Sequence, residues 1–429
     1  MSRIKTKHRG PLHGEITPPA DKSISHRAVM FASLAEGEST ISNFLQAEDP
    51  LRTLQAFRRM GVQIDDTDKN RIIVKGRGLH GLSAPEDVID CGNSGTTMRL
   101  MSGVLAAQSF SSVLTGDAFL RKRPMGRIIK PLSEMGADIV PENGGYPPLH
   151  IKGKNLQPVT YNSPIASAQV KSAILLAGLY CKGRTTVTEP GKSRDHTERM
   201  LLSCGADITI SDLEVSIRGT KGLTPFDITI PGDLSSAAFF IVAALIVPGS
   251  DIVVKNVGIN PTRTGIIEIL LRMGGEISLL NEHEVSGEPV ADIQVRHSNL
   301  SGTDIGGDLV LRAIDEFPIL CVASAMARGM TRISGAAELR VKESDRIASM
   351  ATELKKMGVH VEEFENGLAV EGSEKIRSAT VQSHGDHRIA MSLAIAGLTV
   401  EEETTVEDTE CVNTSFPGFT DLLDKLYSS

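Results

Sequence analysis

The sequence contains no tryptophan, and its phenylalanine and tyrosine residues are scarce, since aromatic residues make up only 4% of the chain. Hydrophobic residues still make up 40%, which is close to the average of globular proteins, so the core is expected to be aliphatic. Long hydrophobic runs are also missing. The longest one, residues 237–247, falls well short of the roughly 20 residues that a membrane-spanning helix needs. We therefore expect a globular protein that does not span a membrane.

An excess of basic residues is absent as well. The net charge of −8 argues against a nucleic-acid partner, because binding to a phosphate backbone relies on surplus Lys and Arg. Residues 1–15 include basic residues but no apolar stretch follows them, so they do not form a secretory signal. The five cysteines form no CxxC pair and have no zinc-like spacing, which is typical of reduced thiols. We expect a cytoplasmic, monomeric protein whose partners are small molecules.

One unit recurs about every 70 residues along the 429-residue chain, a length typical of two or three domains of about 150 residues. Its first signature is an amphipathic helix that ends at a glycine and leads directly into a strand. Glycine at this position favours the left-handed backbone that closes a helix. The five glycines are Gly61, Gly136, Gly205, Gly274 and Gly358, and a sixth copy, residues 419–429, reaches the end of the sequence.

The second signature is an apolar helix followed by a turn of small residues and a β-branched strand. It occurs at residues 26–42, 98–115, 169–188, 237–254, 317–334 and 388–407. Helices that are apolar on nearly every face are normally buried between other elements. Three copies precede residue 230 and three follow it. The sequence therefore predicts an α/β protein of two similar domains, each with three repeats, and a cleft where the domains face each other.

The residues that open these six helices are largely polar. They are Lys22-Ser23-Ile24-Ser25, Asn93-Ser94-Gly95-Thr96, Ser167-Ala168-Gln169, Asp233-Leu234-Ser235-Ser236, Asp315-Glu316 and Asp386-His387-Arg388. For a single helix, ordinary N-capping explains such residues as well as function does. Six starts directed at one cleft would instead bind anions, because helix N-termini offer unpaired N–H groups and a positive dipole end. Basic residues lie in or near these starts: Lys22, Arg27, Arg99, Arg123, Arg194, Lys342, Arg346 and Arg388. The ligands are expected to carry phosphate and carboxylate groups.

Other motifs have simpler interpretations. Residues 76–81 match GxGxxG, but Pro85 follows where a dinucleotide-binding fold requires a helix, so we interpret them as a turn. His384 and His387 have a spacing that could ligate a metal, yet no paired carboxylates accompany them, and we expect no metal site.

Residues 340–348, RVKESDRIA, place Lys342 and Arg346 four apart, which on a helix puts both on one face. Such a pair would favour a bound anion, with Glu343 beside it for proton transfer.

Eight blocks, in this order, closely resemble the enolpyruvyl transferase family, in particular its members that act on shikimate-3-phosphate. The blocks are DKSISHRA, CGNSGTTMR, RKRPMGR, SAQVKSAILLAGL, AIDEFP, RVKESDR, GDHRIAM and TSFPGF, which together cover nearly the whole chain. The resemblance implies two domains, each of three βαβαββ repeats, with the active site in the cleft between them. Residues 1–20 and 230–429 would form domain I, which carries the phosphoenolpyruvate and catalytic carboxylate side. Residues 21–229 would form domain II, on the shikimate-3-phosphate side.

The same resemblance implies transfer of the enolpyruvyl group of phosphoenolpyruvate to the 5-hydroxyl of shikimate-3-phosphate, without a metal or organic cofactor. The implied catalytic residues are Lys22, Asp315, Glu343 and His387. Those implied to bind shikimate-3-phosphate are Lys22, Ser23, Arg27, Ser167, Gln169, Ser193, Arg194, Asp315 and Lys342. Those implied to bind phosphoenolpyruvate are Lys22, Asn93, Gly95, Arg123, Gln169, Glu343, Arg346 and Arg388. Glyphosate, which resembles phosphoenolpyruvate, is expected to compete with it.

Three positions depart from the better-known bacterial pattern. Ala168 stands in place of a second serine, His196 in place of a tyrosine, and Thr414 in place of a lysine that contacts phosphoenolpyruvate in many relatives.

Two other functions stay open at this point. A related transferase acts on UDP-N-acetylglucosamine with a reactive cysteine, for which Cys91 would be the candidate, and a non-enzymatic protein that binds phosphate or RNA ends could also use repeated α/β units.

Overall fold

The chain folds into two compact units, which the computed structural model describes over residues 2–373 and 375–427. Unit 1 contains the residues up to Pro19, Pro231–Glu284 and those from Glu288 onward, and unit 2 contains Ala20–Ile230 and Val285–Gly287. Each unit has its own core of buried hydrophobic side chains, most of them aliphatic. No helix among the described residues is long and apolar enough to cross a membrane.

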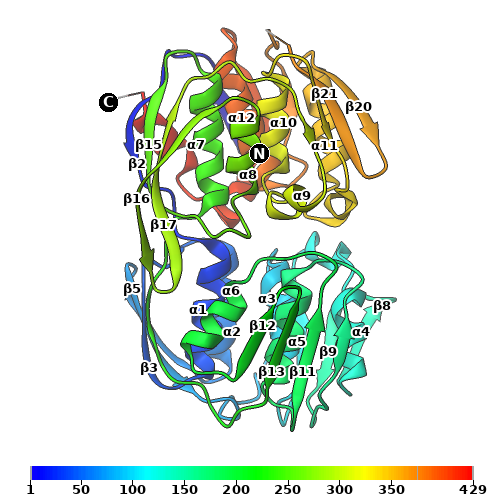
Figure 1. Cartoon of the computed structure of the whole chain (residues 1–429). Helices are drawn as coiled ribbons and strands as arrows, with labels where there is room; N and C mark the ends of the chain where they lie inside the picture. Colours follow the sequence, from blue (N-terminus) through cyan, green and yellow to red (C-terminus); the bar gives the residue numbers. More distant parts are fainter. Residues whose placement is uncertain (1, 374, 428–429) are drawn as a thin grey trace. The chain divides into compact units, whose positions relative to one another are not determined.

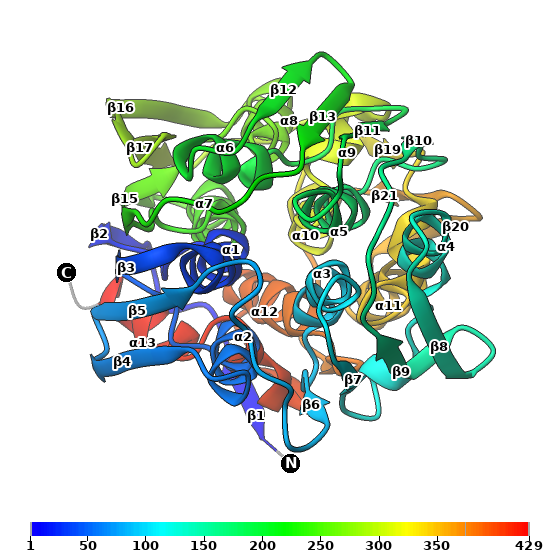
Figure 2. The same ribbon diagram turned by 90° about the horizontal axis from the view of Figure 1, so that it is seen from below.

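Unit 2 is built from three copies of one motif. Its apolar helices are α1 (Lys22–Leu34), α3 (Gly95–Leu105) and α5 (Ala168–Gly178), and its amphipathic ones are α2 (Glu48–Arg59), α4 (Gly126–Glu134) and α6 (His196–Ser203). Its strands are β3 (Glu36–Ser42), β4 (Gln63–Asp68), β5 (Arg71–Arg77), β6 (Ile89–Asp90), β7 (Ser111–Thr115), β8 (Asp138–Asn143), β9 (Tyr146–Lys152), β10 (Thr160–Asn162), β11 (Arg184–Thr188), β12 (Ile208–Ser211), β13 (Glu214–Arg218) and β14 (Asp227–Thr229). A short 3-10 helix, η1 (Leu120–Lys122), precedes α4. Figure 2 shows α1, α3 and α5 end-on, with strands around them.

Unit 1 repeats the same motif. Its apolar helices are α7 (Leu234–Ile246), α10 (Phe317–Ala325) and α12 (His387–Ala396), and the other helices are α8 (Gly265–Arg272), α9 (Asp308–Arg312), α11 (Arg346–Lys356) and α13 (Phe419–Lys425). Its strands are β1 (Arg3–Thr6), β2 (His13–Ile16), β15 (Asp251–Gly258), β16 (Glu276–Val285), β17 (Glu288–Arg296), β18 (Asp304–Ile305), β19 (Met330–Ile333), β20 (His360–Phe364), β21 (Gly367–Glu371), β22 (Thr380–Gln382) and β23 (Thr404–Glu407). The 3-10 helices are η2 (Ala337–Val341), η3 (Gly397–Thr399) and η4 (Thr409–Thr414). Figure 1 shows α7, α10 and α12 between strands of this unit.

Five sheets of the described chain have four strands in one order, and the sixth, β1-β23-β22, has three. Each four-stranded sheet joins a parallel pair to an antiparallel hairpin, as in β10-β11-β13-β12 and β6-β7-β9-β8. In four sheets the apolar helix connects the two parallel strands, whereas α1 and α7 each lead from a strand of one sheet to a strand of another. The amphipathic helix leads into the hairpin of each four-stranded sheet. The predicted α/β fold with six repeats is therefore confirmed.

Segments distant in the sequence complete three of these sheets. In unit 1, β1 pairs with β23 and β2 pairs in parallel with β15, so the beginning of the chain lies among strands formed much later. In unit 2, β14 pairs in parallel with β3, with Ile228 opposite Ile41. The chain therefore passes from unit 1 to unit 2 near residue 20 and returns near residue 230.

The helix boundaries follow from local chemistry. Side chains of the residues that precede five of the six apolar helices accept a backbone N–H of the first turn; these residues are Asp21, Ser94, Ser167, Asp233 and Asp386. The helix α10 has no such side-chain cap, but Pro318 lies in its first turn, where proline is favoured because its backbone angle suits a helix and its missing N–H needs no partner. All five predicted glycines have positive φ, between 75° and 91°, as a helix-closing position requires.

Candidate active site

In unit 2, the first turn of α1 holds Lys22 beside a second element. Asp21 caps the helix, which leaves the Lys22 side chain at its N-terminal end. Lys22 Nζ lies 3.1 Å from Asp49 Oδ2 of α2, and only 16% of the Lys22 side chain is exposed. The lysine is therefore fixed by an ion pair at a helix start.

Arg27 lies one turn further along α1 and is 3% exposed. Its Nε donates to Thr197 Oγ1 of α6 at 2.6 Å, and its Nη2 donates to Ser172 Oγ of α5 at 2.9 Å. Its Nη1 donates to the carbonyl oxygen of Ser23 at 3.0 Å. The guanidinium therefore ties three helices together, and its orientation is set before any ligand binds.

The start of α3 brings three predicted phosphoenolpyruvate residues side by side. Asn93 donates to Asp117 Oδ2 at 2.8 Å and accepts from Arg123 Nη2 at 2.6 Å. A Cβ atom added at Gly95 would lie 2.9 Å from Arg99 Nη1 and 3.3 Å from Arg123 Nη1. Glycine therefore leaves room between two guanidinium groups and the helix backbone.

Gln169, in the first turn of α5, links this helix to α3. Its Oε1 accepts from Arg99 Nη1 at 2.7 Å, and its Nε2 donates to Thr96 Oγ1 at 2.9 Å. Ser167 is the N-cap of the same helix. Ser193 and Arg194 lie in the loop before α6, where Ser193 is buried and Arg194 half-buried.

In unit 1, Asp315 precedes α10 and lies close to three cationic side chains. Its oxygens are 3.7 Å from Lys342 Nζ, 3.4 Å from Arg346 Nη1 and 3.8 Å from Arg388 Nη2. The Asp315 side chain remains 18% exposed. The Asp315 carboxylate therefore lies where three positively charged side chains meet.

Arg346 is the centre of what we call the acidic cluster of unit 1, formed with Asp315, Glu343 and Asp386. Its Nη2 lies 2.7 Å from Glu343 Oε2 and its Nε lies 2.8 Å from Asp386 Oδ2. Burial alone would lower the pKa of Arg346, but the charges of Asp386, Glu343 and Asp315 outweigh it and raise this pKa above its ordinary value. The guanidinium therefore stays charged and holds three carboxylates in place.

The prediction that Lys342 and Arg346 share a helix face is wrong. Lys342 follows the 3-10 helix η2, and α11 begins only at Arg346, with Asp345 as its N-cap. The side chain of Asp345 accepts the N–H of Ala348, which starts the helix after Lys342. The positive charges of Lys342 and Arg346 meet at Asp315 instead, through the fold of the loop.

His387 is the first residue of α12, behind the N-cap Asp386. Its Nδ1 lies 3.4 Å from Thr414 Oγ1, so the threonine that replaces the familiar lysine contacts a predicted catalytic residue. His384, the other histidine of this segment, bonds Glu353 through Nε2 at 2.7 Å. Across residues 2–373 and 375–427, no three His, Cys, Asp or Glu residues are grouped so that they could hold a metal ion.

Cys91, the candidate nucleophile of the alternative transferase, is fully buried. Burial raises the pKa of its thiol far above the ordinary value, and the nearby charge of Asp90 adds to this effect. A thiol that stays protonated and inaccessible is a poor nucleophile. The structure therefore does not favour a cysteine-dependent reaction at this position.

Four residues that contact predicted site residues were not themselves predicted: Asp49, Asp117, Glu189 and Asp386. Asp386 stands in the GDHR block and at a helix start, so its sequence context offered a signal. Asp49, Asp117 and Glu189 meet their partners only through tertiary contacts. No local pattern marks them.

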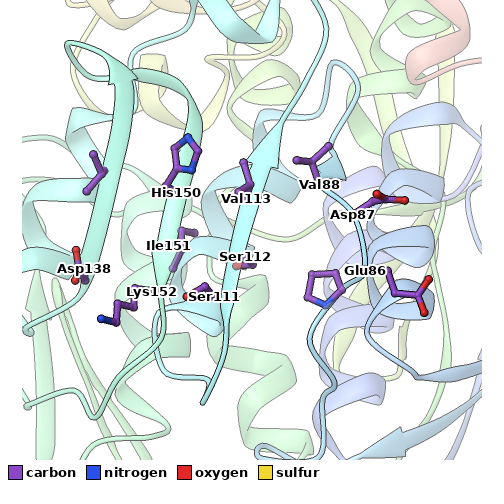
Figure 3. A pocket seen from close by; sticks show the side chains of 12 residues that line it. Glu86, Asp87, Val88, Ser111, Ser112, Val113, Asp138, His150, Ile151 and Lys152 are labelled. Atoms are coloured by element: carbon purple, nitrogen blue, oxygen red, sulfur yellow. The ribbon is translucent and has the colours of Figure 1, made fainter.

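A hollow of about 620 Å³ lies on one face of the β6-β7-β9-β8 sheet. Its walls come from residues 85–88, β7, β8 and β9 (Figure 3). None of the predicted site residues lines it. We therefore place the candidate site at the helix starts and not in this hollow.

Comparisons with known proteins point in one direction. A sequence model of the EPSP synthase family, described as 3-phosphoshikimate 1-carboxyvinyltransferase, matches residues 6–423. A protein of that name from Geotalea uraniireducens is 60% identical over 427 residues, which cover 99% of each chain. Another, from Thermodesulfovibrio yellowstonii, is 56% identical over 429 residues and covers 99% of this chain and 100% of the relative. A solved structure of EPSP synthase from Acinetobacter baumannii is 49% identical, with a TM-score of 0.88, and the match covers 99% of this chain and 98% of that one.

Proposed function

The chain belongs to the EPSP synthase family, and from this premise we propose how its residues transfer the enolpyruvyl group of phosphoenolpyruvate to the 5-hydroxyl of shikimate-3-phosphate. The products are 5-enolpyruvylshikimate-3-phosphate and phosphate, on the route to aromatic amino acids. The observation that carries the assignment is 60% identity, over nearly the full length, to a 3-phosphoshikimate 1-carboxyvinyltransferase.

The acidic cluster of unit 1 supplies proton transfer in this proposal. Asp315 accepts the proton of the 5-hydroxyl while the hydroxyl oxygen attacks C2 of phosphoenolpyruvate. Glu343 delivers a proton to C3, which becomes a methyl group. In the second step Glu343 takes a proton back from C3, the double bond forms again, and the bond between C2 and the phosphate oxygen breaks. The proton held by Asp315 passes to the departing phosphate, which returns both carboxyl groups to their starting states. Support comes from Arg346, which lies within 3.4 Å of both carboxylates and holds them near each other. His387 lies on the adjacent helix start and is assigned to the same reaction centre.

Unit 2 supplies anion recognition. Ser23, Arg27, Ser167, Gln169, Ser193 and Arg194 are assigned to shikimate-3-phosphate, with Asp315 and Lys342 from unit 1. Asn93, Gly95, Arg123 and Gln169 are assigned to phosphoenolpyruvate, with Glu343, Arg346 and Arg388 from unit 1. Lys22 serves both ligands and stabilises the negative charge of the departing phosphate. Support comes from the helix starts, whose N–H groups and positive dipole ends favour such anions.

These assignments place residues of both units around the same two ligands, so we propose that the ligands draw the units together around an interdomain cleft. X-ray scattering with shikimate-3-phosphate and an unreactive phosphoenolpyruvate mimic is expected to show a smaller radius of gyration than without ligands. An unchanged radius would reject this closure. The same experiment gives the mass in solution, which we expect to equal that of one 45.9-kDa chain in a cytoplasmic, monomeric enzyme.

The activity itself is tested by supplying shikimate-3-phosphate and phosphoenolpyruvate and measuring released phosphate, with the second product identified by its mass. We expect equal amounts of the two products, without any added metal or organic cofactor. Phosphate release that does not depend on shikimate-3-phosphate would reject the proposed reaction.

A further inference from the structure

Unit 2 contains a buried ionic cluster that the proposed mechanism does not use. Lys171 of α5 lies 2.8 Å from Glu189 Oε2, in the loop after β11, and 2.6 Å from Glu198 Oε1 of α6. The three side chains are only 3%, 4% and 2% exposed. Burying ions costs several kcal/mol each, so such a cluster is weak evidence for stability and raises the question of what it holds.

Each carboxylate oxygen of Glu189 accepts a hydrogen bond from a residue that is predicted to bind shikimate-3-phosphate. Its Oε1 accepts the backbone N–H of Ser167 at 2.8 Å. Its Oε2 accepts the hydroxyl of Ser193 at 2.7 Å. Ser167 begins α5 and Ser193 lies in the loop before α6, so a single carboxylate sets the distance between two segments assigned to shikimate-3-phosphate.

Lys171 in turn fixes Glu189. Burial lowers the pKa of Lys171, but the charges of Glu198 and Glu189 outweigh it and raise this pKa, so the ammonium persists. The lysine also lies 3.5 Å from the carbonyl oxygen of Ser193, so it contacts both Glu189 and the loop that Glu189 holds.

We propose that Glu189, anchored by Lys171, is a positioning residue for shikimate-3-phosphate: it holds Ser167 and Ser193 at the separation that the ligand requires. The proposal rests on the proposed function. Glu189 acts through the two serines and does not itself touch the ligand, whose negative charge its carboxylate would repel. Loss of Glu189 should therefore weaken shikimate-3-phosphate binding while barely affecting the second substrate.

The test compares Glu189→Ala with a matched control, Glu198→Ala. Both remove a buried carboxylate that contacts Lys171, but in the described chain only Glu189 is bonded to the serines. Binding of shikimate-3-phosphate alone is measured by calorimetry, together with thermal unfolding and the KM of phosphoenolpyruvate. Glu189→Ala is expected to raise the Kd by about 10-fold or more, since two hydrogen bonds that orient the site are lost. The KM of phosphoenolpyruvate in this variant, and the Kd in Glu198→Ala, should stay within about twofold of wild type.

Glu189→Gln provides a second variant should Glu189→Ala not fold. Its amide oxygen can still accept the N–H of Ser167, but its NH2 group then replaces the oxygen that accepts from Ser193 and pairs with Lys171, and it faces the Lys171 ammonium. A Kd increase of about fivefold is expected, which corresponds to the loss of one hydrogen bond. A Kd within twofold of wild type in either folded Glu189 variant would overturn the positioning role. So would equal Kd increases in Glu189→Ala and Glu198→Ala.

Wild-type turnover is measured first, which separates this inference from the proposed function. Absence of turnover would reject the proposed function, and the positioning role with it. Normal turnover with unchanged binding in the Glu189 variants would reject the positioning role alone.

Discussion

The two units hold their predicted site arginines in different ways. In unit 2, Arg27, Arg99 and Arg123 donate to hydroxyl, amide and backbone carbonyl oxygens. In unit 1, Arg346 donates to three carboxylates. Hydroxyl, amide and carbonyl oxygens thus help to orient the arginines of unit 2 at the helix starts, whereas Arg346 is surrounded by carboxylates and holds them near one another.

The largest effect expected from this difference is on the stability of Arg346→Met. Asp386 is 0% exposed, and removing Arg346 leaves it and Glu343 without their shared cation. Breaking a buried ion pair on one side costs about 3–5 kcal/mol. Urea unfolding should show a loss of this size. Arg296→Met is the control, because Arg296 also bridges two carboxylates but is 50% exposed, and its loss should cost less than about 1 kcal/mol. Equal losses of stability in both variants would show that the buried acidic cluster contributes no more to stability than an exposed pair of salt bridges.

Asp315→Asn should come next, with an effect on turnover. The amide keeps the shape of the side chain but cannot accept the proton of the 5-hydroxyl, and loss of a general base lowers kcat by about 100-fold or more. The Kd of shikimate-3-phosphate should change much less. Asp308→Asn, an exposed carboxylate that pairs with Arg312 in α9, should leave kcat unchanged. Near-normal kcat in Asp315→Asn would remove Asp315 from the chemistry.

Arg27→Met should weaken the binding of shikimate-3-phosphate strongly while lowering the stability of the protein only slightly. The hydroxyl partners of Arg27 keep a bond to each other after the substitution, since Ser172 Oγ lies 2.6 Å from Thr197 Oγ1. We expect a stability loss clearly smaller than that of Arg346→Met, at about 1–2 kcal/mol. The KM of shikimate-3-phosphate should rise by about 10-fold or more, because a charge-assisted bond to the ligand is lost. A stability loss as large as that of Arg346→Met would contradict the comparison.

Gly95→Ala should have the smallest effect, which concerns selectivity. The added methyl group would crowd Arg99 and Arg123 at the start of α3. Glyphosate is longer than phosphoenolpyruvate, so it should be excluded more strongly, and one methyl group typically changes such a preference by about 10-fold. The measured quantity is the inhibition constant of glyphosate relative to the KM of phosphoenolpyruvate. Gly126→Ala, at the start of α4 with open space around it, should leave this ratio unchanged. If Gly95→Ala raises only the KM of phosphoenolpyruvate, the placement of Gly95 is wrong.

The repeats were predictable because their signals are local. A helix that closes at Gly136 or Gly358 requires a left-handed backbone, which glycine adopts without steric cost. The presence of glycine in the sequence is therefore enough to mark the end of the helix. The same local logic would have corrected the one wrong helix. Asp345 followed by an apolar helical segment is an N-cap pattern, and it places Lys342 outside α11.

The partners of the predicted site residues were not predictable in this way. Glu189 joins Ser167 and Ser193, and Asp49 joins Lys22, yet nothing in the surrounding sequence distinguishes these acids from those on the surface. Their role depends on burial, which makes an ion pair strong and restricts where the carboxylate can point. Burial is a property of the packed chain.

The sequence by itself determined the six repeats, the apolar helices with polar starts and the residue types gathered there, because hydrophobic periodicity, capping and glycine conformations act over a few residues. Only the tertiary structure decided which charges meet: that Arg346 contacts Asp315, Glu343 and Asp386, and that Lys171 anchors Glu189. The physical reason is that Coulomb energies and hydrogen bonds depend on distance and burial, and the fold sets both between residues far apart in the chain.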